Sequence, residues 1–116
     1  MSDAPFDRNT VLENLGGDES LLAEVSGIFI ADWPENLARL RAAVAAGDAE
    51  AVRRAAHAVK GAAGNFSAER AVQAARTLEF AGRDGNLSQA PQLLDETVAA
   101  VEALIAALKT ELGDPR

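Results

Sequence analysis

The sequence is short of cysteine, aromatic residues and uninterrupted apolar stretches. It has no cysteine, which excludes a disulfide framework, a thiolate metal site and a cysteine nucleophile. Charged residues interrupt every hydrophobic run within a turn or two, so no segment is expected to span a bilayer. The first residues lack the basic start and apolar core of a secretory signal. Together these absences predict a cytoplasmic protein without a membrane segment.

The charge of the chain is one-sided. Eighteen Asp and Glu residues against eleven Lys and Arg residues give a net charge of −7. The phosphates of nucleic acid repel an acidic chain, so a general DNA- or RNA-binding role is disfavoured. At 116 residues the chain suits one domain, residues 1–116, with a core that needs no disulfide or metal.

Alanine and leucine are abundant, and the apolar residues are spaced for helices. Aromatic residues make up only 4% of the chain, whereas alanine and leucine are the strongest helix formers. Apolar residues recur mostly in steps of three and four: Leu21, Val25, Ile28, Trp33, Leu37, Leu40 and Val44, and then Leu94, Val98, Val101, Ile105, Leu108 and Leu112. We expect an all-α fold, an antiparallel up-down-up-down four-helix bundle with a short additional N-terminal helix.

Glycine and short polar residues mark the expected helix boundaries. They predict a short helix over about 9–15 and bundle helices over about 18–46, 48–64, 67–83 and 88–112. Asp18 and Ser67 are expected to cap the helices that follow them, and the last turn is expected to begin at Gly82. Pro34 should kink the first long helix near 33–34 or split it.

The only histidine, His57, lies in a segment with unusual neighbours. On a helix, Arg53 and Lys60 share a stripe with His57 that is offset from the buried face, so the imidazole is expected at the surface. Gly61 and Gly64 each cost about 1 kcal/mol in a helix, and without side chains they would let a phosphoryl group or another surface approach the ring. From spacing alone, an ordinary surface histidine near a helix end fits equally well.

Other site chemistries find little support in the sequence. One histidine without cysteine cannot assemble a usual zinc set, so no metal site is expected. No glycine-flanked serine suggests a catalytic triad, and no glycine-rich loop suggests a site for ATP phosphates. The chain is therefore expected to hold no cofactor of its own and not to act as a kinase.

The segment His57-Ala58-Val59-Lys60-Gly61 resembles the His-x-x-Lys-Gly motif of histidine-containing phosphotransfer (HPt) domains. The resemblance covers nearly the whole chain, and the turns and helix positions around the motif make it specific. These positions are Gly16-Gly17-Asp18, Leu21-Leu22, Phe29, Pro34, Leu37, Leu40, Gly47-Asp48, Leu78-Glu79, Arg83 and Gly85.

The resemblance implies a relay in two-component signal transduction. HPt domains carry a phosphoryl group between aspartates of receiver domains through an exposed histidine. His57 is then the phospho-acceptor, through Nε2, and Lys60 offsets the phosphate charge. Gly61 gives the phosphoryl group access, and Glu79 orients the imidazole. The implied partners are receiver domains of a hybrid histidine kinase and of a response regulator, which would hold the essential Mg²⁺, and the chain is expected to be a monomer.

Partner docking is expected around the histidine. The candidate contacts are Arg53, Arg54, Ala56, Gly64 and Phe80. For Phe80 the alternatives are partial burial against a loop or a lone exposed apolar side chain, which is common on protein surfaces.

The chain departs from the family pattern at a few positions. Val59 replaces a more usual leucine, and Ala62 and Ala63 stand where many relatives carry serine, so a hydroxyl donor to the phosphate is missing. Ser67 replaces a frequent glycine after the motif, which puts the local backbone path in question. Acidic residues elsewhere are expected to form a solvated face: Glu96, Glu102 and Glu111.

Two other functions stay open. The first is a helical interaction module that binds receiver domains without phosphotransfer, although the presence of both His57 and Lys60 argues against it. The second is a phospho-acceptor fragment of a chemotaxis kinase, which the ending of the chain disfavours.

Overall fold

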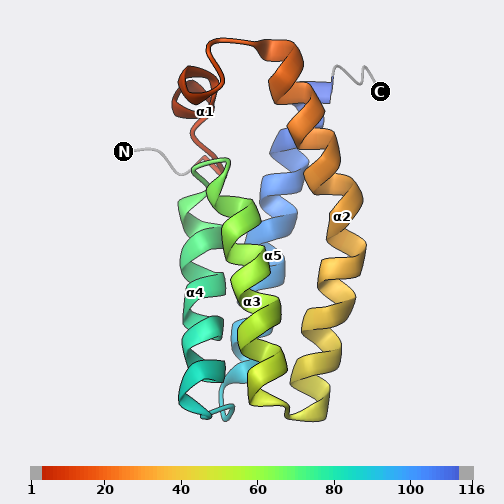
Figure 1. The fold of residues 1–116 in the computed structure, drawn as a ribbon, viewed down its shortest axis with the longest axis vertical. Helices are drawn as coiled ribbons and strands as arrows, with labels where there is room; N and C mark the ends of the chain where they lie inside the picture. Colours follow the sequence, from red (N-terminus) through yellow and green to blue (C-terminus); the bar gives the residue numbers. More distant parts are fainter. Residues whose placement is uncertain (1–3, 113–116) are drawn as a thin grey trace.

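The computed structural model describes residues 4–112, and all its regular elements are helices (Figure 1). They are α1 (Arg8–Asn14), α2 (Glu19–Ala46), α3 (Ala49–Gly64), α4 (Glu69–Asp84), α5 (Ala90–Lys109) and a 3₁₀ turn, η1 (Thr110–Leu112). No strand occurs over this range, which confirms the all-α prediction. None of these helices is both long and apolar enough to cross a bilayer.

Aspartates begin three of the helices, and glycines end two of them. The carboxylates of Asp7, Asp18 and Asp48 each accept a hydrogen bond from a backbone amide in the first turn, at 3.0–3.2 Å. Gly47 and Gly85 end α2 and α4 with φ of 64° and 73°, a left-handed conformation that glycine adopts without strain. These local signals set where the chain reverses between the long helices.

Helix α2 runs through Pro34 as one continuous element of 28 residues, so the expected split does not occur. Pro34 lies on the exposed side of the helix. On that side, water can serve the carbonyl that loses its amide donor to the proline ring. Trp33, beside it, is buried and anchors the same turn in the core.

The connection between α3 and α4 corrects the prediction for Ser67. Helix α4 begins after Ala68, which makes no side-chain capping bond, and Ser67 lies one residue earlier with φ of +50°. Its neighbours Phe66 and Ala68 are both buried, and the Phe66 ring makes edge-to-face contacts with Phe6 and Phe29. Because packing fixes the residues on either side, Ser67 takes a left-handed conformation instead of serving as the cap.

Helices α3 and α4 pack most closely at Gly82, which was expected in the turn but lies inside α4. A Cβ atom at Gly82 would lie 2.6 Å from the backbone nitrogen of Arg53 and 2.7 Å from the backbone oxygen of Ala49. Only glycine permits this approach. Three residues earlier on α4, Glu79 meets His57 on α3, so the two helices run antiparallel with a fixed register.

The core lies between the four long helices, which extend lengthwise beside one another in Figure 1. Its fully buried leucines are Leu22, Leu40, Leu78, Leu104 and Leu108. Helix α1 lies at one end, near the α3–α4 connection (Figure 1). There Arg8 Nε donates a hydrogen bond to Glu111 Oε2 at 2.8 Å. Glu111 is therefore not part of a solvated face, because it ties the two ends of the described chain together.

Candidate functional site

Helix α3 presents His57 to solvent, and 63% of its side-chain surface is exposed. The opposite face of the helix is buried, and its residues are Val52, Ala56, Val59 and Ala63. Ala56 has no exposed surface at all. The expectation that Ala56 contacts a partner is therefore wrong, since the core already covers it.

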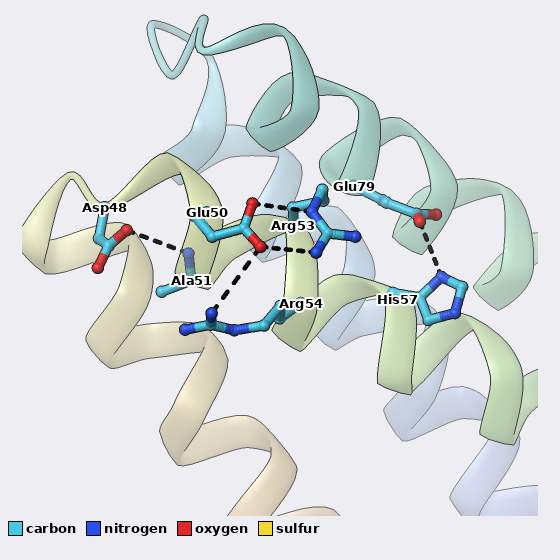
Figure 2. A network of polar contacts seen from close by, with 7 residues as sticks. All are labelled: Asp48, Glu50, Ala51, Arg53, Arg54, His57 and Glu79. Atoms are coloured by element: carbon cyan, nitrogen blue, oxygen red, sulfur yellow. Dashed lines mark hydrogen bonds and ion pairs between the residues drawn. The ribbon is translucent and has the colours of Figure 1, made fainter.

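Glu79 of α4 lies directly beside the imidazole (Figure 2). Its Oε2 is 2.8 Å from His57 Nδ1, and its Oε1 is 2.7 Å from Lys60 Nζ. The second contact is an ion pair without the alignment of a hydrogen bond. The structure thus brings together three of the residues that the sequence singled out, His57, Lys60 and Glu79.

The carboxylate of Glu79 determines which nitrogen of the His57 imidazole carries the proton. Only 11% of its side chain is exposed. Burial by itself raises the pKa of this carboxyl, but the contacts with Lys60 and His57 together outweigh burial and leave the pKa below its ordinary value. An ionised carboxylate can only accept, so Nδ1 of the neutral ring carries the proton and donates it. The lone pair is then on Nε2, the ring nitrogen that Glu79 does not engage.

Arg53 and Arg54 lie one turn before His57, but neither is a free cation. Arg53 donates two hydrogen bonds to Glu50, at 2.9 and 2.6 Å, and Arg54 lies 3.8 Å from the same carboxylate (Figure 2). The hydrogen bonds to Arg53 lower the pKa of Glu50. The basic stripe expected from the sequence is therefore partly neutralised.

Gly61 lies one turn after His57 on α3, and Gly64 lies two turns after it, at the end of the helix. A Cβ atom at either position would meet nothing within 4 Å, and neither residue has a positive φ. Neither packing nor backbone conformation within the described chain calls for glycine here. The two positions leave the surface beside the imidazole open.

Among known families, the model of the Hpt domain matches residues 24–111, which is most of the chain. The chain belongs to the Hpt domain family. The match spans the helices that carry His57, Lys60 and Glu79.

A solved structure extends the comparison to nearly the full length of this Hpt protein. Histidine-containing phosphotransfer protein B (HptB) from Pseudomonas aeruginosa PAO1 superimposes with a TM-score of 0.88. The sequences are 29% identical, and the alignment covers 99% of this chain and 100% of HptB. A comparison with curated proteins gives no match. This Hpt protein is thus of the phosphotransfer type in both family and fold.

Phe80 follows Glu79 on α4 of this Hpt protein, and 40% of its surface is exposed. The guanidinium carbon of Arg83 lies 4.3 Å from the centre of the Phe80 ring. The rest of the Phe80 side chain is covered, so its exposure alone does not separate a docking residue from a partly exposed aromatic residue. The exposed part of the ring is stacked under the Arg83 guanidinium.

Two features of the site were not found from the sequence. One is the ion pair between Lys60 and Glu79, which joins different helices. The other is the close contact of α4 with α3 at Gly82, which brings α4 near enough for Glu79 to reach His57. Gly82 does lie on the same face of α4 as Ala71, Ala75 and Leu78, and a small residue on a buried face is the signal that could have revealed it.

Among residues 4–112, no group of three or more acidic or histidine side chains is arranged to hold a metal ion. The carboxylate nearest the histidine is already engaged by Lys60 and His57.

Proposed function

We propose that His57 takes a phosphoryl group from a phospho-aspartate of one receiver domain and gives it to an aspartate of another. The donor would belong to a hybrid histidine kinase and the acceptor to a response regulator. The observation that supports this proposal is the environment of the His57 imidazole. Its Nδ1 is bound to a buried, ionised carboxylate at 2.8 Å, and the side chain is exposed.

The chemistry needs only groups that the site and its partner supply. The Nε2 lone pair forms the new N–P bond, the acyl phosphate P–O bond breaks, and the electron pair leaves with the donor aspartate as a carboxylate. The ring gains positive charge while Nδ1 keeps its proton. Glu79 stabilises that charge without taking the proton. In the second half of the relay, the N–P bond breaks as an aspartate oxygen of the acceptor attacks.

Lys60 and Gly61 have supporting roles in this proposal. Lys60 lies one turn after His57, 25% of its side chain is exposed, and its ammonium is held by Glu79. From there it can turn toward the phosphoryl oxygens and offset their charge. Gly61 leaves space for those oxygens, because nothing projects from its Cα. The essential Mg²⁺ would belong to the receiver domain.

The proposal also covers the helix arrangement, the cellular location and the contacts with the receiver domain. Short connections between α2, α3, α4 and α5 support an antiparallel up-down-up-down bundle, with α1 as the added N-terminal helix. We expect the protein to work in the cytoplasm as a monomer. Arg53, Arg54, Gly64 and Phe80 remain the expected contacts for the receiver domain.

The test is transfer of label from a ³²P-phosphorylated receiver domain. Wild-type protein should take up the label, and His57→Gln should take up none while keeping its helical circular dichroism spectrum and its unfolding midpoint. Lys60→Ala should fold normally and accept label about tenfold more slowly, because one charge that stabilises the transferring group is lost.

The outcomes separate the alternatives. Label on the His57→Gln variant would contradict the proposal. Binding of receiver domains by the wild type without any transfer would instead identify a non-catalytic interaction module.

A further inference from the structure

The edge of α4 beside α3 carries two arginines in register with Glu79. Arg76 lies three residues before Glu79 and Arg83 four residues after it, a spacing that places all three on one side of the helix. Along the helix axis these separations are about 4.5 and 6 Å. The arginines therefore flank the residue that contacts His57, on the helix next to the one that carries the imidazole.

Arg83 is held in place by Phe80. Its guanidinium stacks on the ring at 4.3 Å, with 60% of the arginine side chain and 40% of the phenylalanine exposed. Arg83 Nε also donates a long hydrogen bond to Asp84 Oδ1, at 3.4 Å, in an ion pair whose two side chains are both exposed. Stacking restricts the long arginine side chain, and only its Nε is hydrogen-bonded, to Asp84, so an incoming acceptor would lose less entropy on binding the guanidinium.

Neither arginine is tied to another helix among the described residues. Arg76 forms no ion pair with any residue from 4 to 112, and Arg83 pairs only with its exposed neighbour Asp84. Neither Phe80 nor Arg83 belongs to the buried core. By contrast, α5 carries three acidic residues and one lysine.

We propose that Arg76, Arg83 and Phe80 form an arm of the docking surface on α4 that binds carboxylates at the rim of a receiver domain's acidic phosphorylation site. This inference rests on the proposed function, which brings that acidic site to His57 Nε2. An interface of standard size covers about 800 Å² on each partner, a patch of about 16 Å radius. Centred on His57, such a patch reaches both arginines. The α4 arm sets affinity and association rate, and the chemical step stays with His57, Lys60 and Glu79.

The test compares Arg83→Gln and Arg76→Gln with Arg70→Gln. Arg70 is an exposed arginine of the same helix, nine residues before Glu79 and therefore on the opposite face. For each variant, receiver binding is titrated at low and high salt. Single-turnover label transfer is then measured against receiver concentration.

We expect Arg83→Gln to weaken receiver binding about fivefold at low salt, with a smaller loss for Arg76→Gln and none for Arg70→Gln. The half-saturating concentration for transfer should rise by the same factor while the maximal rate is unchanged. The salt dependence of binding should also be shallower in both variants, because fewer charges contribute. Phe80→Leu, which keeps an apolar contact but removes the stacking surface, should show part of the Arg83 effect.

Equal affinity of the Arg83 and Arg70 variants would overturn the inference, as would a loss confined to the maximal rate. If receiver domains bind with the expected arginine dependence but no label moves, the α4 arm stands and the proposed relay function fails. If no receiver domain binds the wild type, both fail.

Discussion

The inner seam between α3 and α4 and the outer face of α3 both carry glycine inside a helix, for opposite reasons. At Gly82, in the seam, a side chain would run into the backbone of the neighbouring helix. At Gly61 and Gly64, on the outer face, a side chain would meet nothing. The first glycine is explained by the protein's own packing. Packing within the described chain does not explain the other two, and under the proposed function they leave room for a partner that approaches from outside.

The two regions also act together. The close approach at Gly82 sets the distance between α3 and α4, and that distance lets the Glu79 carboxylate reach Nδ1 of His57. A tightly packed seam thus holds the imidazole in one tautomer, while the open face leaves the other nitrogen accessible.

The largest expected effect is at the seam. Gly82→Ala places a methyl group 2.6 Å from a backbone atom that cannot move alone, so the helices must separate. We expect a loss of about 1–3 kcal/mol in the free energy of unfolding, measured in urea, together with slower phosphotransfer because Glu79 shifts. An unchanged unfolding free energy would show that α4 does not approach α3 this closely.

The next effect concerns a position where the backbone favours glycine and the chain has serine. Ser67 has φ of +50°, and Ser67→Gly should raise the free energy of unfolding by about 1 kcal/mol, since relief of left-handed strain outweighs the added freedom of the unfolded chain. Ser67→Ala is the control and should give no gain. Equal stability of the two variants would argue against the left-handed conformation.

On the outer face the same type of change should have the opposite sign from the seam. Gly61→Ala removes an unfavourable glycine from an exposed helix and should stabilise the protein by about 0.5–1 kcal/mol. Transfer to His57 should nevertheless slow, because the methyl group occupies space needed by the phosphoryl oxygens. A Gly61→Ala variant that is more stable and transfers at the full rate would remove the functional explanation for this glycine.

The smallest effect compares two carboxylates. The pKa of Glu79 in the seam and that of Glu50 on the surface are both lowered in the folded protein. Each therefore contributes stability above its ordinary pKa, and that stability is lost as the pH falls through the lowered value. Unfolding titrations of Glu79→Gln and Glu50→Gln should each show a weaker dependence on acidic pH than the wild type. High salt should reduce the stability that exposed Glu50 contributes more than the stability that buried Glu79 contributes. An equal response to salt would contradict the burial of Glu79.

Features set by nearby residues could be predicted from the sequence. Helical spacing predicted the all-α fold, and the expected cap at Asp18 is present, because a cap depends on residues three positions apart. The exposure of His57 followed from its place opposite the stripe of Val52 and Val59.

Features that depend on contacts between distant segments could not be predicted. Arg8 meets Glu111 across 103 positions, and Ser67 has its left-handed conformation next to Phe66, whose ring contacts Phe6 and Phe29 from other parts of the chain. Gly82 looked like a turn residue because glycine serves both turns and close helix contacts, and only the neighbouring helix distinguishes the two. The ion pair between Lys60 and Glu79 could not be predicted either, because it joins two different helices.

The most direct test of the proposed relay is to locate the phosphoryl group on the ring. Protein labelled with ¹⁵N in its single histidine would be phosphorylated by a phospho-receiver domain and examined by NMR through nitrogen–phosphorus coupling. We expect coupling at Nε2 of His57, with Nδ1 still protonated toward Glu79. Coupling at Nδ1, or a fully phosphorylated protein without phosphohistidine, would contradict the account.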